Sequence, residues 1–142
     1  MDSIKIEINS GEFKVDKNFV KNSVQDTIRE LQSNSGLETE QEVEISVAVV
    51  SKSKIKEINK KWRNKDEKTD VLSFCYENTD TKLEGEVVLC LDIIKENAQE
   101  DGIKIEEELR KNIIHSILHI TGYQHGEEMF KLQDKILEAK LT

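Results

Sequence analysis

The sequence has 142 residues, of which 36% are hydrophobic and 35% charged, and this balance predicts one soluble globular domain over residues 1–142 with its own core. It contains no apolar run long enough for a transmembrane helix, and residues 1–5 lack the pattern of a signal peptide, so we expect a cytoplasmic protein without a membrane partner. The net charge of −8, averaged over the molecule, counts against nucleic acid as a partner, and no DNA partner is expected.

The charge is unevenly distributed along the chain. Residues 52–68 contain eight basic and three acidic residues, which gives this segment a charge of +5 and leaves −13 for the rest. A basic face of this kind can steer a polyanion to one side of an acidic protein. A solvated lysine-rich helix would show the same composition, so charge alone leaves both interpretations open.

The first half of the chain alternates strands and helices. Residues 4–8 alternate apolar and polar side chains, which predicts a half-buried strand. Asp16 can cap a helix that runs to about Ser35 and stops at Gly36. Residues 43–50 become more apolar toward their end, as a central strand does.

A second helix follows, capped by Ser51 or Ser53, and a third strand is expected at residues 71–76. The apolar stripe of this helix consists of Ile55, Ile58 and Trp62, and we expect Trp62 and Phe74 to belong to the core rather than to stack on bases. Cys75 and Cys90 are the only cysteines, and we expect both to be reduced and packed as small buried hydrophobes.

A polar loop at 77–84 leads to a fourth strand at 87–91. Three helices complete the chain: a short one that Asp92 can cap and Gly102 ends, a long one from near Ile105 to near Gly122, and a last one at 127–139. The strand–helix–strand–helix–strand order at the front favours parallel crossovers, and the short loop before the fourth strand favours an antiparallel neighbour. The prediction is an α+β (α/β-like) domain with a mixed four-stranded sheet, three strands parallel and one antiparallel, and about five helices.

All three histidines lie between residues 115 and 125. His115 and His119 are four residues apart in an apolar helix, so their imidazoles share one face. We expect the helix itself to be buried against the sheet. Gly122 can take the positive φ that ends the helix, and His125 then returns toward the other two. Three such imidazoles can hold Zn²⁺ and leave a fourth position for water, as in catalytic zinc sites. Incidental histidines are the alternative, but three of them on an apolar helix need protons or a metal to satisfy them.

The histidine spacing resembles the zinc-binding run of metzincin proteases, His-Glu-x-x-His-x-x-Gly-x-x-His, and predicts a metzincin-like zinc helix. Those proteases place their general base directly after the first histidine. This chain has Ser116 there, and a serine at its ordinary pKa cannot accept the proton. A metallopeptidase therefore stays an alternative that lacks its base.

A second resemblance covers most of the chain. Four segments resemble the YbeY family of bacterial endoribonucleases in their order and spacing, and the total length of the chain matches as well. They are Asn59-Lys60-Lys61-Trp62-Arg63, Thr69-Asp70-Val71-Leu72-Ser73-Phe74, Gly85-Glu86-Val87-Val88 and the three-histidine stretch. The chain departs from that pattern at four positions: Ser116 in place of glycine, Gln124 and Glu86 in place of aspartate, and Cys75 in place of proline.

The resemblance implies a single-strand-specific, metal-dependent endoribonuclease that acts in 16S rRNA 3′-end maturation and ribosome quality control. It implies His115, His119 and His125 as metal ligands, Arg63 as the residue needed for activity, and cleft positions at Asn59, Thr69, Asp70 and Ser73. Tyr123, beside the metal run, is a further candidate for substrate contact. The implied partners are single-stranded or ribosomal RNA, the small ribosomal subunit and an assembly GTPase. One Zn²⁺ per chain is expected, with Ni²⁺ or a similar ion as the alternative.

The chemistry of phosphodiester hydrolysis supports Arg63 independently. The reaction builds negative charge on the phosphoryl oxygens, and a guanidinium binds such oxygens bidentately. A surface ion pair of Arg63 with Asp66 or Glu67 is the alternative, and Asp70 could either cap loop amides or orient Arg63 or a ligand histidine. A third hypothesis for the function is a non-catalytic ribosome-assembly factor with a structural metal.

Overall fold

The computed structural model describes residues 4–34, 41–123 and 126–141. Within them lie four strands and five helices: β1 Ile4–Asn9, α1 Lys17–Asn34, β2 Glu42–Val49, α2 Lys52–Arg63, β3 Val71–Asn78, β4 Lys82–Leu89, α3 Leu91–Asp101, α4 Ile105–Ile120 and α5 Glu127–Leu141. None of the described helices has the length and apolar character needed to span a membrane.

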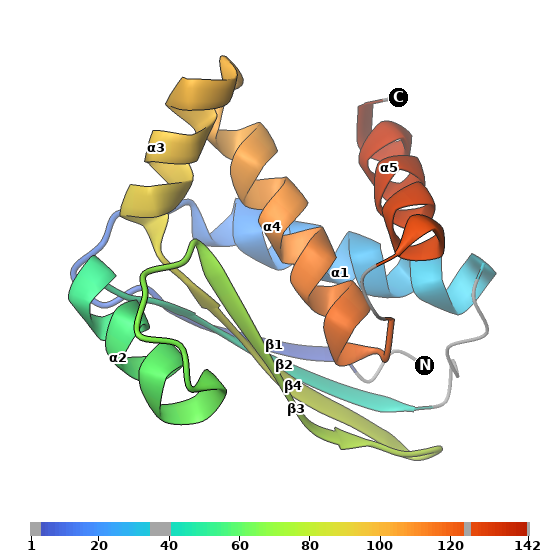
Figure 1. Cartoon of the computed structure of the whole chain (residues 1–142). Coiled ribbons are helices and arrows are strands. Elements are labelled where there is room, and N and C mark those ends of the chain that lie inside the picture. Colours follow the sequence, from blue (N-terminus) through green and yellow to red (C-terminus); the bar gives the residue numbers. More distant parts are fainter. Residues whose placement is uncertain (1–3, 35–40, 124–125, 142) are drawn as a thin grey trace.

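The strands form one sheet in the order β1-β2-β4-β3, with α1 and α4 on one face and α2 on the other (Figure 1). β1, β2 and β4 are parallel and β3 is antiparallel to β4, which confirms the predicted α+β class and the mixed sheet. The strand that runs opposite to the other three is β3, however, whereas the order of elements in the sequence predicted that β4 would be the antiparallel strand. The polar residues predicted to form a loop at 77–84 instead extend β3 and β4 into a hairpin, because the backbone ladder continues past the buried part of the sheet.

The local signals at helix ends are mostly confirmed. Asp16 accepts a hydrogen bond from the Phe19 amide at 3.1 Å, and Ser51 rather than Ser53 caps α2 by accepting from the Lys54 amide at 3.1 Å. Gly102 ends α3 with a φ of 69°. Asp92 does not cap that helix: Cys90 is the N-cap, and Asp92 lies in the first turn. The predicted stop at Gly36 lies outside the described residues.

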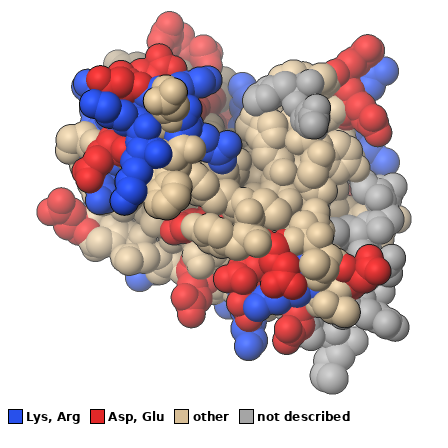
Figure 2. Space-filling view, turned by 60° about the horizontal axis from the view of Figure 1, so that its bottom comes forward, with Lys and Arg blue, Asp and Glu red and all other residues tan. Residues whose placement is uncertain are grey.

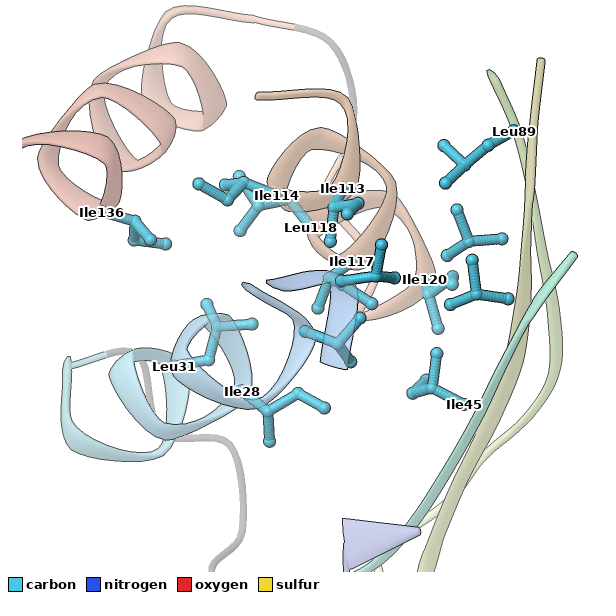
Figure 3. Packing of buried hydrophobic residues seen from close by; sticks show 14 of the residues in the cluster. Ile28, Leu31, Ile45, Leu89, Ile113, Ile114, Ile117, Leu118, Ile120 and Ile136 are labelled. Atoms are coloured by element: carbon cyan, nitrogen blue, oxygen red, sulfur yellow. The ribbon is translucent and has the colours of Figure 1, made fainter. Parts of the chain in front are cut away.

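Helix α4 lies at the centre of the core. Ten of its sixteen residues are buried, and Ile113, Ile114, Ile117 and Leu118 are each at most 1% exposed among side chains of α1, α5, β2 and β4 (Figure 3). Burial of each such side chain contributes about 1.5–3 kcal/mol to folding, before conformational entropy is counted. This packing fixes the rotation of α4, so its remaining polar side chains occupy one defined stripe.

Gly85 of β4 allows the C-terminal end of α4 to approach the sheet. A Cβ at this position would lie 2.7 Å from Ile120 Cγ2 and 2.9 Å from the Phe74 carbonyl oxygen. Any larger residue would therefore push the helix away from the strands. The end of α4 that carries His119 is positioned in part by this glycine.

Two predicted core residues are not buried. Trp62 is 64% exposed, although its helical spacing from Ile55 predicted a core position, and Cys75 is exposed on the edge strand β3. Cys90 is buried as expected, and Phe74 is half-buried against a small second cluster formed with α2. The pattern along the sequence gives the face of an element correctly but not whether another element covers that face.

Candidate active site

A groove with a volume of about 1220 Å³ runs between α4 and α5 on one side and α2 and β3 on the other. Its lining includes every predicted site residue that the structure describes: Asn59, Arg63, Thr69, Asp70, Ser73, His115, His119 and Tyr123. His125, the predicted third metal ligand, lies outside the described residues. Residues from four segments of the sequence therefore meet in one hollow.

A hydrogen bond to a glutamine of the last helix, α5, orients His115. Its Nδ1 lies 2.9 Å from Oε1 of Gln133, which is 4% exposed. The amide oxygen only accepts hydrogen bonds, so Nδ1 of His115 donates and carries the proton. In the neutral imidazole, Nε2 then has the lone pair, which is the form that binds a metal.

The turn at the end of α4 orients His119 in the same way. Gly122 has a φ of 104°, and the Gly122 and Tyr123 amides donate to the carbonyls of His119 and Leu118 in a Schellman arrangement. This turn places the Tyr123 carbonyl oxygen 3.0 Å from His119 Nδ1, and because a carbonyl only accepts, Nδ1 is the protonated nitrogen. Tyr123 therefore acts on the site through its backbone.

The two Nε2 atoms face each other at 3.1 Å. Each lies opposite a protonated Nδ1, so in the neutral state two lone pairs point at one another, and only a shared proton or a cation makes that contact favourable. Two imidazole ligands at about 2.0–2.1 Å from a tetrahedral zinc ion have their nitrogens about 3.3 Å apart, so the observed spacing fits a metal. His115 and His119 would hold the ion, with His125 as the predicted third ligand.

Sequence reasoning did not find Gln133, which comes from a helix beyond the metal run. Arg110 helps to hold this helix in place: the buried guanidinium donates to the carbonyl oxygens of Leu137 at 3.0 Å and Ile136 at 2.8 Å. Burial lowers the pKa of Arg110, and Asp26 opposes that shift. No signal in the sequence pairs residues 133 and 115, since only the packing of α5 on α4 brings them together.

Arg63 lies on the opposite wall of the groove and is exposed. Its Nη2 donates to the Ser73 carbonyl of β3, and its guanidinium carbon lies 4.9 Å from the centre of the Phe74 ring. The alternative ion pair with Asp66 or Glu67 is not formed between these described residues; Asp66 lies 3.9 Å from Lys56 instead. Arg63 is therefore held over the groove by an aromatic ring and a neutral carbonyl, which leave its positive charge uncompensated.

The remaining predicted residues shape the loop between α2 and β3. Asn59 is 3% exposed, and its side chain donates to the Glu67 carbonyl at 3.0 Å, which fixes the loop against the helix. The Asp70 carboxylate accepts from Thr69 at 3.2 Å and from Asn97 at 3.4 Å. It therefore neither caps loop amides nor orients Arg63 or a described histidine, which were its two predicted roles.

Basic side chains gather on the α2 side of the groove (Figure 2). Four lysines in this region form no ion pair with any described residue: Lys60, Lys61, Lys65 and Lys68. Lys65 and Lys68 also line the groove. This wall therefore presents unneutralised positive charge, as a polyanion site requires.

Ser116, at the position of the metzincin glutamate, is 1% exposed. Its hydroxyl has no hydrogen-bond partner among the described residues. The side chain is thus almost fully buried where it lines the groove beside His115, and it supplies no carboxylate base.

Comparisons with known proteins show the family of this chain. The family model described as Endoribonuclease YbeY matches residues 5–140. Among the relatives, Endoribonuclease YbeY of Sulfurihydrogenibium sp. is 40% identical, over 91% of this chain and 86% of the relative, and that of Persephonella marina is 38% identical, over 97% and 92%. The solution structure of TM1509 from Thermotoga maritima has a TM-score of 0.63 and 31% identity, over 95% of this chain and 87% of that one. The chain belongs to the YbeY family.

Proposed function

We propose that this protein is a single-strand-specific, metal-dependent endoribonuclease that acts in 16S rRNA 3′-end maturation and ribosome quality control. The observation that carries the proposal is the paired Nε2 atoms of His115 and His119, 3.1 Å apart, in one groove with an uncompensated Arg63. The endoribonuclease family to which the chain belongs supports hydrolysis of RNA as the reaction. The lysine-rich wall offers the charge that an RNA backbone needs.

The residues of this chain divide the work between two walls. His115 and His119, together with His125, would bind Zn²⁺, or Ni²⁺ where that ion is more available. When bound, the metal supplies a Lewis acid and lowers the pKa of a coordinated water to about 7. Arg63 contacts the phosphoryl oxygens and stabilises the charge that develops on them, and the lysines steer the RNA into the groove.

The family resemblance motivates the proposed setting of the reaction. The substrate would be ribosomal RNA, with the small ribosomal subunit and an assembly GTPase as partners, in the cytoplasm. Each of these can be tested by co-purification from growing cells before and after ribonuclease treatment.

Two observations disfavour the metallopeptidase alternative. Ser116 is buried and supplies no carboxylate beside the metal ligands. A peptide adding to the edge strand β3 would need its outward carbonyls, and the Ser73 carbonyl already accepts a hydrogen bond from Arg63. Digestion of casein at neutral pH by the metal-loaded protein would nevertheless support the metallopeptidase alternative.

The deciding experiment is cleavage of a single-stranded ribosomal RNA fragment by wild type, His119→Ala and Arg63→Ala, with Lys17→Ala on the exposed start of α1 as the control. We expect cleavage to be lost in the first two variants and kept in the control, with metal content lost only in His119→Ala. Products with 5′-phosphate ends indicate attack by water, and 2′,3′-cyclic ends indicate attack by the RNA's own hydroxyl. Equal cleavage by all four proteins would refute the proposal and favour an assembly factor with a structural metal.

A further inference from the structure

The groove collects the aromatic residues of the chain. Five of the seven line it: Trp62, Phe74, Tyr76, Tyr123 and Phe130. The three aromatic side chains that are exposed, Trp62 at 64%, Tyr76 at 60% and Phe130 at 45%, all belong to this set. Singly exposed apolar residues are common on protein surfaces, but here all the exposed aromatics line one groove that has basic side chains on its α2 side.

Trp62 stands out because its helical position faces the interior. It lies seven residues after Ile55, which is fully buried, so the two side chains leave α2 on nearly the same face. The sheet buries Ile55, whereas the indole of Trp62 stays largely exposed. An indole on a core-facing position, left 64% exposed on the wall of a groove, is suited to contact with a ligand.

The surroundings of Trp62 indicate the chemistry of that ligand. The next residue, Arg63, carries the uncompensated guanidinium, and the ammonium of Lys61 lies 5.2 Å from the centre of the indole ring. A flat apolar surface with an ammonium over its ring, followed in the chain by a guanidinium, matches a nucleotide, which has a flat base attached to an anionic backbone. A purely apolar partner would leave both cations without a counter-charge.

We infer that Trp62 is a stacking platform for an unpaired nucleobase of the strand whose phosphate Arg63 binds. The inference rests on the proposed function and adds the feature of the substrate that is recognised. In a duplex the faces of the bases are covered by their neighbours, so a platform of this kind selects single strands, whereas lysines alone attract any polyanion. Because every base has a π-face, the site selects the unpaired state and not the sequence.

The other two exposed aromatics extend the platform. The hydroxyl of Tyr76 donates to Glu86 at 2.6 Å, which holds the ring at the edge of β3. The Phe130 ring centre lies 6.2 Å from that of His115, at the metal end of the groove. The groove thus carries aromatic rings both on its α2 side and at its metal end.

Trp62 is the only tryptophan, so its fluorescence reports on this one contact. The experiment mixes the metal-loaded protein with oligouridylate, or with an abasic ribose-phosphate oligomer of the same length, and reads fluorescence in a stopped flow before cleavage begins. We expect quenching by oligouridylate and much less by the abasic oligomer. By anisotropy, Trp62→Ala should bind oligouridylate about 5- to 150-fold more weakly, and Trp62→Phe should keep most of the affinity.

The control is Ile103→Ala, which removes an exposed apolar side chain outside the groove and should leave binding unchanged. Circular dichroism of each variant checks the fold. Equal quenching by the two oligomers, or unchanged binding by Trp62→Ala, would overturn the stacking role. Quenching without cleavage by the wild type would keep stacking and refute the nuclease, and cleavage without quenching would keep the nuclease and refute stacking.

Discussion

The two walls of the groove are built differently. On the α4 wall, both described histidines lie on a helix with ten buried residues, and each Nδ1 has a defined acceptor. On the α2 wall, only Ile55 and Asn59 of the helix are buried, and the functional side chains are exposed cations and an exposed indole. The first wall is preorganised and the second is adaptable, which suits metal binding and capture of a flexible polyanion respectively.

This difference has an energetic basis. A metal site gains affinity when its ligands are already oriented, because less conformational entropy is lost when the ion binds. A phosphate backbone is bound mainly through its charge, which acts at a distance and tolerates mobile side chains. Changes to the α4 wall should therefore alter metal affinity, and changes to the α2 wall should alter RNA binding or turnover while the metal content stays constant.

The largest effect is expected at Arg63. Arg63→Lys keeps the charge but loses the planar fork, so we expect the cleavage rate to fall by about 10²–10³-fold. Initial rates, with metal content measured on the same samples, test this. Full activity of the lysine variant would show that charge alone suffices and that the bidentate geometry is not used.

A smaller effect is expected on the α4 wall. Gln133→Leu removes the acceptor of the His115 Nδ1 proton at similar volume, so metal affinity should fall by about 10- to 100-fold, and activity should return when excess metal is added. Competition with a chromogenic chelator measures this affinity. Gln133→Glu, which keeps an acceptor, is the matched control. An unchanged affinity in Gln133→Leu would mean that the glutamine only packs against the histidine.

The lysines of the α2 wall should affect salt dependence most. Replacing Lys60, Lys61, Lys65 and Lys68 with glutamine should reduce the slope of log K against log salt for single-stranded RNA by up to about 3, since each phosphate contact contributes about 0.7. Metal affinity should not change. Lys17 and Lys21 on α1, changed to glutamine, provide the control. The same slope in both variants would place the RNA elsewhere.

The smallest effect concerns the rim of the α2 side. The hydrogen bond to Glu86, followed by burial, raises the pKa of Tyr76 to about 12 from an ordinary value of 10.0. The folded state therefore holds this proton more tightly, and the associated stability is present below pH 10 and is lost as the pH rises toward 12. In Glu86→Gln, the phenolate absorbance of Tyr76 should appear at lower pH. Identical titration curves would show that the ring is not held by Glu86.

Much of the fold could be predicted because its signals are local. Alternation at residues 4–8, the cap at Asp16 and the glycine at 102 depend on residues close in sequence, and each prediction is confirmed. The hairpin of β3 and β4 was partly missed because Glu77 and Glu84 look like loop residues, yet they pair across the strands. Whether these residues pair in a β-ladder depends on the tertiary structure, which overrides their local preference for a loop.

The sequence by itself determined which residues could carry the chemistry. The spacing of His115 and His119, the glycine at 122 and the arginine after Trp62 follow from chain order alone, because one helix or one turn relates them. Only the tertiary structure decided what surrounds them: Gln133 at His115, the Ser73 carbonyl at Arg63, and the 64% exposure of Trp62. Helical periodicity fixes the direction of a side chain, whereas its burial and partners depend on elements that arrive from elsewhere in the chain.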